Sequence, residues 1–270
     1  MVATLTVIRG DSFELDQSLL SLYHWEEMHI ELHSVSKSFA RTRALVEFDL
    51  NVAPSSIIVL LGENGAGKST LLRILGGVSV PDSGQVCFDG KVFSREDMEL
   101  RKRLHFTPDI PLLFTEQTVA RNISTLAALY GKSSIGRDEY FAEWLEETGV
   151  AALMKRTVGH LSRGQIWKVE LACMAVIEPE LWLVDEPFAS GMDEIGMRAF
   201  RRLASHLVAE GGTVIYTTQM VKMAAAFSDH VCVIRDGKNV MWAESDKIRT
   251  SLTANPDGAA RILRGEFPDS

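Results

Sequence analysis

The stretch from residue 57 to 75 constrains the fold of this chain most, because three different patterns follow one another within it. It opens with the apolar run Ile57 to Leu61, which has the length and character of a buried β-strand. The run breaks at Gly62, passes through a glycine-rich loop and continues from Lys68 with apolar residues at helical spacing. The sequence therefore predicts a strand, a tight loop and a helix in succession.

The loop itself matches the pattern G-x-x-x-x-G-K-[ST], which is typical of loops that bind phosphate groups. Glycines let the backbone approach phosphate oxygens with its N–H groups pointing inward, and the positive end of the following helix adds to the attraction. We expect Lys68 to hold the outer phosphates and Ser69 to offer its hydroxyl to Mg²⁺. A loop that only turns the chain is the alternative, and the fixed places of the glycines, the lysine and the serine argue against it. The expected phosphate loop comprises Gly62, Glu63, Asn64, Gly65, Ala66, Gly67, Lys68, Ser69 and Thr70.

The composition is that of a globular protein with an acidic balance: 46% of the 270 residues are hydrophobic, and the formal net charge is −8. Binding to the backbone of nucleic acids requires clustered Lys and Arg, so we expect no nucleic-acid partner. Apolar runs such as Leu171 to Ile177 fall far short of the ~20 residues of a membrane helix, and the first 27 residues lack the apolar core of a secretory signal. Cys87, Cys173 and Cys232 stand among apolar neighbours without metal-ligand spacing, which predicts buried thiols in a reducing compartment.

The chain divides by pattern into three parts. Residues 1–27 carry no motif, and we expect them to be an extension outside the core. The working domain is expected over residues 28–244, with a helical lobe at about residues 109–165 and a strand over Arg101 to Thr107 just before it. Residues 245–270 read as a polar tail that is too short for another domain. Within the lobe, the helical pattern covers Val119 to Tyr130 and Tyr140 to Leu153.

Two acidic residues follow a second buried strand. The run Leu181 to Val184 is entirely apolar, and Asp185 and Glu186 come directly after it. Open α/β sheets place their ligands at the carboxyl ends of strands, so both carboxylates are expected at a ligand site. Asp185 suits Mg²⁺, bound through water, and Glu186 suits a water molecule beside the outermost phosphate. A further strand, Thr213 to Thr218, carries Gln219 at its tip.

The order of these motifs resembles the ATP-binding subunit of an ABC (ATP-binding cassette) transporter, over about residues 28 to 244. Besides the phosphate loop and the acidic pair, the resemblance includes the aromatic Phe39, the sequence Leu-Ser-x-Gly-Gln and an acidic turn at Asp193. Phe39 corresponds to a platform for adenine, although a lone Phe is more often part of the core. Each short motif alone has false positives, whereas five in this order leave little room for another family. The signature sequence here consists of Ser162, Arg163, Gly164 and Gln165.

The resemblance implies an α/β fold of the P-loop NTPase class, with an ABC-type recombinase-like core, an antiparallel β subdomain and an inserted α-helical subdomain. It implies ATP and Mg²⁺ as cofactors, with Ser69, Asp185 and Asp109 around the metal. It also implies that two copies, identical or different, meet head to tail. The serine-led signature of one copy would then close on the γ-phosphate that Lys68 of the other copy holds, with Asp193 at the dimer turn, and hydrolysis would release the pair.

Two positions depart from the family pattern. Asp109 stands where a Gln usually links Mg²⁺ and the attacking water to the transporter-facing lobe, and Gln219 replaces the usual His. In addition, Arg163 replaces the commoner Gly of the signature, a change that the family often tolerates. The negative charge of Asp109 would weaken ATP binding unless the metal lies between them. Replacing the His by a neutral donor costs roughly 1–1.5 kcal/mol, about tenfold in rate at most. The retained general base Glu186 contributes on the order of 10²–10⁴-fold. We therefore predict a slow but genuine ATPase.

The leading interpretation is a cytoplasmic motor subunit that lies on the inner face of the cell membrane and drives a separate integral membrane permease. Export is favoured over import by the compact helical lobe and by the absence of a C-terminal regulatory domain. One alternative is a soluble ABC-type ATPase in repair, translation or cluster assembly, which the acidic charge and the lack of a coiled-coil insertion or second cassette disfavour. Another is an ATP-sensing subunit with little turnover, which Asp109 and Gln219 suggest.

Overall fold

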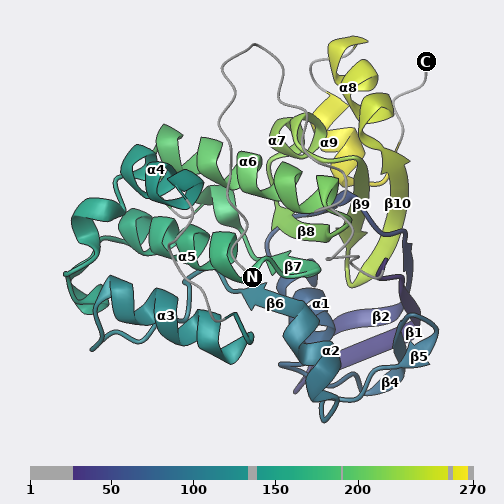
Figure 1. Cartoon of the computed structure of the whole chain (residues 1–270). Helices are drawn as coiled ribbons and strands as arrows, with labels where there is room; N and C mark the ends of the chain where they lie inside the picture. Colours follow the sequence, from purple (N-terminus) through teal and green to yellow (C-terminus); the bar gives the residue numbers. More distant parts are fainter. Residues whose placement is uncertain (1–26, 133–138, 190, 255–257, 267–270) are drawn as a thin grey trace, which may run out of the picture.

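The structure is a computed structural model, and it describes residues 27–132, 139–189, 191–254 and 258–266. Two β-sheets and the helices around them make up this part of the chain (Figure 1). The extension expected over residues 1–27 lies outside the described residues, apart from Glu27. No helix within the described ranges is long and apolar enough to cross a membrane.

A six-stranded sheet forms the centre of the molecule, in the order β10-β9-β3-β8-β7-β6. Its strands are β3 (Ile57–Leu61), β6 (Leu104–Thr107), β7 (Leu181–Val184), β8 (Thr213–Thr218), β9 (His230–Arg235) and β10 (Lys238–Glu244). All of its ladders are parallel except the one between β10 and β9. Parallel sheets are covered on both faces, and β3, β7 and β8 are buried along their whole lengths. The strands predicted for these three segments are confirmed.

The carboxyl ends of the central strands meet at one edge of this sheet. Leu61, the last residue of β3, pairs with Thr218, the last residue of β8. Val184, the last residue of β7, pairs with β8 two residues before its end. The phosphate loop, Asp185 and Gln219 therefore leave the sheet side by side, although they lie far apart in the sequence.

The side chains of the central sheet alternate between two cores. In β3, Ile58 and Leu60 pack into one core with α1 (Lys68–Leu75) and the second sheet. Val59 and Leu61 pack into the other core with α5 (Arg163–Ile177) and α6 (Glu194–Ala209). Because successive side chains of a strand point to opposite faces, a strand that is buried on both faces reads as a continuous apolar run.

An antiparallel sheet, in the order β2-β1-β4-β5, packs against α1 at the lower right of Figure 1. Its strands are β1 (Ile30–Phe39), β2 (Thr42–Val52), β4 (Ser83–Phe88) and β5 (Lys91–Val92), and all of its ladders are antiparallel. This sheet is the antiparallel β subdomain that the resemblance implies. Phe39 pairs with Thr42 at the tip of the hairpin that β1 and β2 form.

The helical lobe consists of α3 (Val119–Leu129), α4 (Glu139–Thr148) and the adjoining part of α5, at the left of Figure 1. The helix predicted over Val119 to Tyr130 is confirmed, and it begins at the cap residue Thr118. The helix predicted over Tyr140 to Leu153 ends early, at Thr148. Gly149 follows with a φ of 75°, which leaves the helical conformation, and a short 3₁₀ turn completes the segment.

Two sequence expectations need correction. The strand predicted over Arg101 to Thr107 starts only at Leu104, because Asp97 caps α2 (Met98–Arg103) by accepting a hydrogen bond from the following turn. The tail expected to be polar from residue 245 contributes to the core instead. It contains α8 (Ser245–Ala254) and α9 (Gly258–Leu263), which pack on α7 (Val221–Ala226). Ile248 and Ile262 of these helices are fully buried.

Candidate functional site

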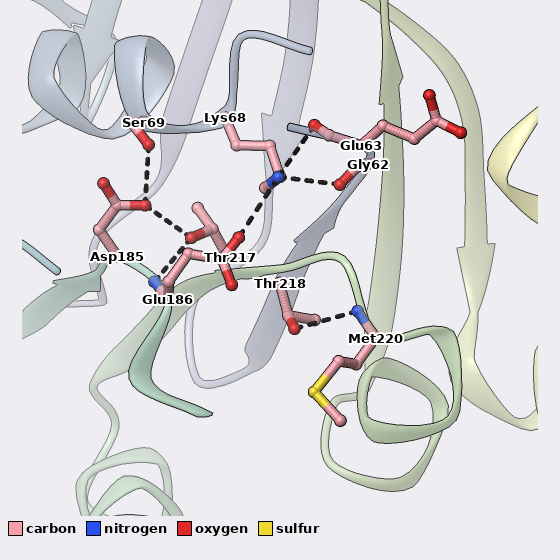
Figure 2. Close-up of polar contacts among 9 residues, drawn as sticks. All are labelled: Gly62, Glu63, Lys68, Ser69, Asp185, Glu186, Thr217, Thr218 and Met220. Atoms are coloured by element: carbon pink, nitrogen blue, oxygen red, sulfur yellow. Dashed lines mark hydrogen bonds and ion pairs between the residues drawn. The ribbon is translucent and has the colours of Figure 1, made fainter. Parts of the chain in front are cut away.

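The phosphate loop runs from the end of β3 into α1 and encloses the ammonium group of its lysine. Lys68 is buried, and its Nζ donates to the backbone carbonyl oxygens of Gly62 at 2.8 Å and Glu63 at 3.1 Å (Figure 2). Gly67 has a φ of 112°, and a Cβ atom there would lie 2.4 Å from the carbonyl oxygen of Ala44. Only glycine fits this position, so the loop can pass close to the β1–β2 hairpin.

Two carboxylates reach the loop from the end of β7 (Figure 2). Asp185 is buried, and its Oδ1 accepts hydrogen bonds from the hydroxyls of Ser69 at 3.0 Å and Thr217 at 2.7 Å. Glu186 Oε1 lies 3.3 Å from Lys68 Nζ and forms an ion pair with it. The structure thus brings the lysine, the serine and both acids together in one site. Their individual roles stay predictions.

Thr217 belongs to none of the sequence motifs, yet its hydroxyl joins both acidic residues. Besides donating to Asp185, its Oγ1 accepts a hydrogen bond from the backbone N–H of Glu186 at 2.8 Å. Thr217 is fully buried. The signal for it in the sequence is a pair of threonines at the carboxyl end of a buried strand, since buried hydroxyl groups require partners.

The backbone of Glu186 adopts a conformation that is uncommon for a side-chain-bearing residue, with a φ of 49°. Such residues cluster at functional sites, where the surrounding structure holds them in place. Burial raises the pKa of the Glu186 carboxyl above its usual value, and the charges of Asp185 and Asp109 add to the rise, whereas Lys68 lowers it. A carboxyl group with this raised pKa beside a phosphate site is suited to accept a proton.

The oxygen atoms of Ser69 and Asp185 have the chemistry that Mg²⁺ prefers. The serine hydroxyl oxygen and Asp185 Oδ1 lie 3.0 Å apart. Protein sites for Mg²⁺ commonly supply one or two oxygen ligands and leave the remaining positions to substrate phosphates and water. In the part of the chain that the structure describes, no three His, Cys, Asp or Glu side chains gather as a metal site. The donor set therefore fits an ion shared with phosphates rather than one enclosed by protein.

Two further predicted residues lie at the end of β8 and at the tip of the β1–β2 hairpin. Gln219 is exposed and follows β8, whose last carbonyl, that of Thr218, accepts a hydrogen bond from the N–H of Gly62 at 3.3 Å. Phe39 is 49% exposed, and Lys37 Nζ lies 5.5 Å from the centre of its ring. The exposure of Phe39 removes the alternative that the ring belongs to the core. Its contact with adenine stays a prediction.

The signature residues form the N-terminus of α5. The Ser162 hydroxyl accepts a hydrogen bond from the N–H of Gln165 at 3.3 Å, and Gln165 Oε1 accepts one from the N–H of Ser162 at 3.0 Å. This reciprocal capping box leaves Ser162 exposed. A Cβ atom at Gly164 would lie 2.7 Å from the carbonyl oxygen of Gly191, so this close approach requires glycine. Within the described residues, the hydrogen bonds of Ser162 and Gln165 do not extend to the phosphate loop of the same chain.

Asp109 lies beyond the end of β6 and is attached to α5. Its carbonyl oxygen accepts hydrogen bonds from Arg163 Nη2 at 3.1 Å and from Trp167 Nε1 at 3.1 Å. Its carboxylate Oδ2 lies 3.7 Å from the same Arg163 nitrogen. The contacts of Asp109 with Arg163 and Trp167 join it to the signature helix, and its expected role as a magnesium ligand stays a prediction.

Asp193 caps α6 and is also tied to the signature helix. Its Oδ1 accepts a hydrogen bond from the N–H of Gly196 at 2.8 Å, and its Oδ2 accepts one from Lys168 Nζ at 2.7 Å. These bonds, the one from Lys168 most of all, lower the pKa of the Asp193 carboxyl. The acidic turn is therefore held against α5, on which Lys168 lies.

A buried polar network connects α5 with the strands that lead to the site. Glu170 of α5 is 2% exposed, and its Oε1 accepts a hydrogen bond from Thr107 Oγ1 of β6 at 2.7 Å. His105 Nε2, also on β6, lies 3.0 Å from the same oxygen. Thr107 Oγ1 accepts a further hydrogen bond from Trp182 Nε1 of β7 at 3.0 Å. The network fixes α5 to two neighbouring strands of the central sheet.

Comparisons with known proteins agree with this arrangement. The model of a protein family described as ABC transporter matches residues 45–189. The sulfate/thiosulfate import ATP-binding protein CysA of Caulobacter vibrioides is 34% identical, over 82% of this chain and 66% of its own length. The Nod factor export ATP-binding protein I of Rhizobium sp. is 31% identical, over 78% of this chain and 69% of its own.

Among solved structures, a dimeric ATP-binding cassette in a post-hydrolysis state, bound to ADP and Pi, has the same fold. Its TM-score is 0.69 at 22% sequence identity, over 80% of this chain and 98% of that one. The family model covers more than half of the chain, and the predicted P-loop NTPase fold with its ABC-type parts is confirmed. The chain therefore belongs to the ABC transporter family, among its ATP-binding subunits.

Proposed function

We propose that this chain binds Mg-ATP and slowly hydrolyses it at an interface with a second ATP-binding subunit, and thereby drives a separate membrane permease. The observation that carries this proposal is the constellation of Lys68, Ser69, Asp185 and Glu186. These side chains supply a cation for the phosphates, two oxygen ligands for a metal and a base for water.

In the proposed reaction, Lys68 exchanges its backbone carbonyl partners for the outer phosphates of ATP. Mg²⁺, held by Ser69 and Asp185, offsets the negative charge of those phosphates when it is bound. Glu186 orients a water molecule and takes its proton as the water oxygen bonds to the γ-phosphorus. The bond between that phosphorus and the leaving ADP oxygen breaks, so the products are ADP and inorganic phosphate. Gln219 is proposed to contact the γ-phosphate in place of the family's His, which keeps the rate low.

The other half of the site is proposed to come from a second subunit, identical or different, in a head-to-tail dimer. Ser162 is exposed at the N-terminus of α5, and helix N-termini attract anions. The solved dimeric cassette gives a precedent for such pairing. In this arrangement the signature, with Gly164 and Gln165, closes on the γ-phosphate of ATP held by the other subunit, and Asp193 lies at the same interface.

The permease is proposed to dock on the loop between β6 and α3. Three large apolar side chains are exposed there, Ile110, Leu112 and Phe114, and Leu112 is 82% exposed. Exposed apolar clusters mark interaction sites in folded proteins. The loop starts at Asp109, which is attached to α5, so a docked protein would follow the movements of the signature helix. This docking would place the subunit on the cytoplasmic face of the membrane.

We favour export as the direction of transport because the helical lobe is compact. The relatives include both importers and exporters.

An ATP-sensing subunit with little turnover is the second candidate, because Asp109 and Gln219 occupy positions that matter for hydrolysis in the family. Phosphate release by the purified complex, compared with that of the Glu186→Gln variant, separates the two. A decrease of a hundredfold or more supports the motor, whereas equal rates support sensing. Sedimentation of Glu186→Gln with and without ATP tests the dimer. Lys68→Ala, which we expect to bind nucleotide more weakly, is the control. Purification of the chain without any integral membrane protein would contradict the permease partner.

A further inference from the structure

Two residues that depart from the family pattern in separate motifs contact each other in the fold. Arg163 lies in the first turn of α5, and Asp109 lies in the loop after β6, 54 residues earlier in the chain. One guanidinium nitrogen of Arg163 donates to the backbone carbonyl of Asp109 at 3.1 Å and lies 3.7 Å from its carboxylate. An arginine and an aspartate have thus replaced, as a contacting pair, two residues that are neutral in the family pattern.

The segment that carries Asp109 begins beside the phosphate site. It leaves β6 next to Asp185, whose N–H donates to the carbonyl oxygen of Thr107 at 2.9 Å. The Asp109 carboxylate is 55% exposed, and its charge is the smallest of the causes that raise the pKa of Glu186, the ion-pair partner of Lys68. An uncompensated negative charge at this place would repel the phosphates of an incoming nucleotide.

We propose that Arg163 is a positioning residue for the phosphate site of its own chain: it holds Asp109 against α5 and compensates the negative charge of that residue, so that ATP can bind. This role is separate from any contact that the signature makes with a second subunit. The side chain of Arg163 is 47% exposed, whereas a Cβ atom at the neighbouring Gly164 would meet a backbone oxygen.

The geometry supports a fixed contact rather than a loose surface ion pair. An exposed pair of opposite charges contributes little by itself. Here Arg163 also donates a hydrogen bond to the backbone carbonyl of Asp109. Trp167, which is fully buried one turn further along α5, donates to the same carbonyl oxygen at 3.1 Å. The position of Asp109 is therefore set by two donors of one helix, and the Asp109 carbonyl oxygen is already occupied by hydrogen bonds from α5.

The test is a double-mutant cycle on nucleotide binding by the full chain, with Arg163→Ala, Asp109→Asn and the double variant. The equilibrium dissociation constant for ATP is measured by calorimetry, in EDTA, where no hydrolysis takes place. We expect Arg163→Ala to raise this constant by about threefold to tenfold at low salt, because it exposes the Asp109 charge. In the Asp109→Asn background the same change should have an effect below about twofold. The increase should shrink between about 50 and 500 mM salt.

Two matched variants serve as controls. Arg163→Lys keeps the charge and should bind ATP as the wild type does. Arg198→Ala removes an arginine that is paired with Glu194 on the exposed face of α6, and it should leave the dissociation constant unchanged.

An equal increase in both backgrounds, or no increase at all, would overturn the proposal. The measurement needs neither dimerisation nor a permease. Its failure is therefore distinguishable from failure of the proposed function.

Discussion

Thr217 shows how much of this site depends on one small side chain. Its hydroxyl group donates a hydrogen bond to the carboxylate that is expected to hold Mg²⁺, and its oxygen accepts one from the backbone N–H of the expected general base. A single hydroxyl group therefore joins the side chain of one acid to the backbone of the other. Neither acid has to rely on the bound nucleotide for its position.

Replacement of Thr217 by Val keeps the shape of the side chain and removes both hydrogen bonds. We expect kcat for ATP hydrolysis to fall about tenfold, because each hydrogen bond contributes about 0.5–1.5 kcal/mol to the geometry of the acids. Thr217→Ser, which retains the hydroxyl, is the control and should recover most of the rate. Steady-state kinetics check this, and an unchanged kcat in Thr217→Val would mean that the acids are positioned by other contacts.

Replacement of Gln219 by His restores the residue that the family usually has at the end of this strand. A charged donor to the γ-phosphate contributes roughly 1–1.5 kcal/mol more than a neutral one, so the hydrolysis rate should rise by up to about tenfold. The measurement is phosphate release at saturating ATP. A rate below that of the wild type would show that Gln219 has a role that His does not fulfil.

The residues of the phosphate loop and the acidic pair were predictable from sequence because backbone geometry and charge fix their spacing. Lys68, Ser69, Asp185 and Glu186 are indeed brought together. Thr217 and the contact between Arg163 and Asp109 were not predictable in this way. Both depend on which segments become neighbours after the sheet and the lobe have formed, and no local pattern in the sequence carries that information.

Among the elements, α5 makes the widest set of specific contacts described above. Its N-terminal residues contact the loop at Asp109 and the turn at Asp193, and its middle contacts β6 through Glu170. Val169, Cys173 and Ile177 of this helix are buried and form an apolar face. The buried carboxylate of Glu170 is the exception on that face.

Replacement of Glu170 by Ala leaves Thr107 and His105 without their buried partner. Breaking a buried charged network of this kind costs about 3–5 kcal/mol of unfolding free energy. Glu170→Gln keeps an acceptor for Thr107 and should cost clearly less. Urea unfolding, followed by tryptophan fluorescence and circular dichroism, measures both variants. A loss below about 1 kcal/mol in Glu170→Ala would contradict this account of the network.

His206 of α6 gives a pH-dependent link to Glu178 at the end of α5. The two side chains lie 3.6 Å apart and are 46% and 39% exposed. The nearby carboxylate of Glu178 raises the pKa of His206 above its usual 6.5. Because the folded state binds this proton more tightly, the pair stabilises the fold below about pH 6.5, and the contribution is lost as the pH rises through the raised pKa.

For a partly exposed pair the contribution is about 0.2–1 kcal/mol. The unfolding free energies of the wild type and His206→Gln should therefore differ most near pH 6 and converge near pH 9. Urea unfolding at both pH values checks this. A difference of the same size at both values would point to packing rather than charge.

The helices and strands also differ in how well the sequence patterns predicted their bounds. Strands buried on both faces were predicted with their full bounds, because a run of apolar residues such as Leu181–Val184 has no exposed position to interrupt it. The strand β6 was predicted too early, since α2 is only six residues long and is defined by its cap rather than by periodicity. The helices after residue 245 were missed because each buries few side chains, among them Ile248 and Ile262.

At the scale of the whole molecule, the exposed apolar loop is the surface that most clearly suggests a partner. Replacement of Leu112 by Asp puts a charge at its centre, and we expect the chain to lose its copurification with an integral membrane protein. Val92→Asp is the matched control, because Val92 is 60% exposed on β5, in the other sheet. Both variants should unfold at the temperature of the wild type. If Leu112→Asp still copurified with the membrane protein, the docking surface would have to lie on another part of the chain.

The anchoring of α5 at several points along its length restricts how the molecule moves. A helix that is held by contacts at several points along its length resists local bending. A displacement of its N-terminus is therefore passed on to the segments that contact it. The turn at Asp193 and the segment at Asp109 must then travel together with the serine at the tip. If ATP binding displaces α5, as the proposed function requires, we expect both segments to be displaced with it.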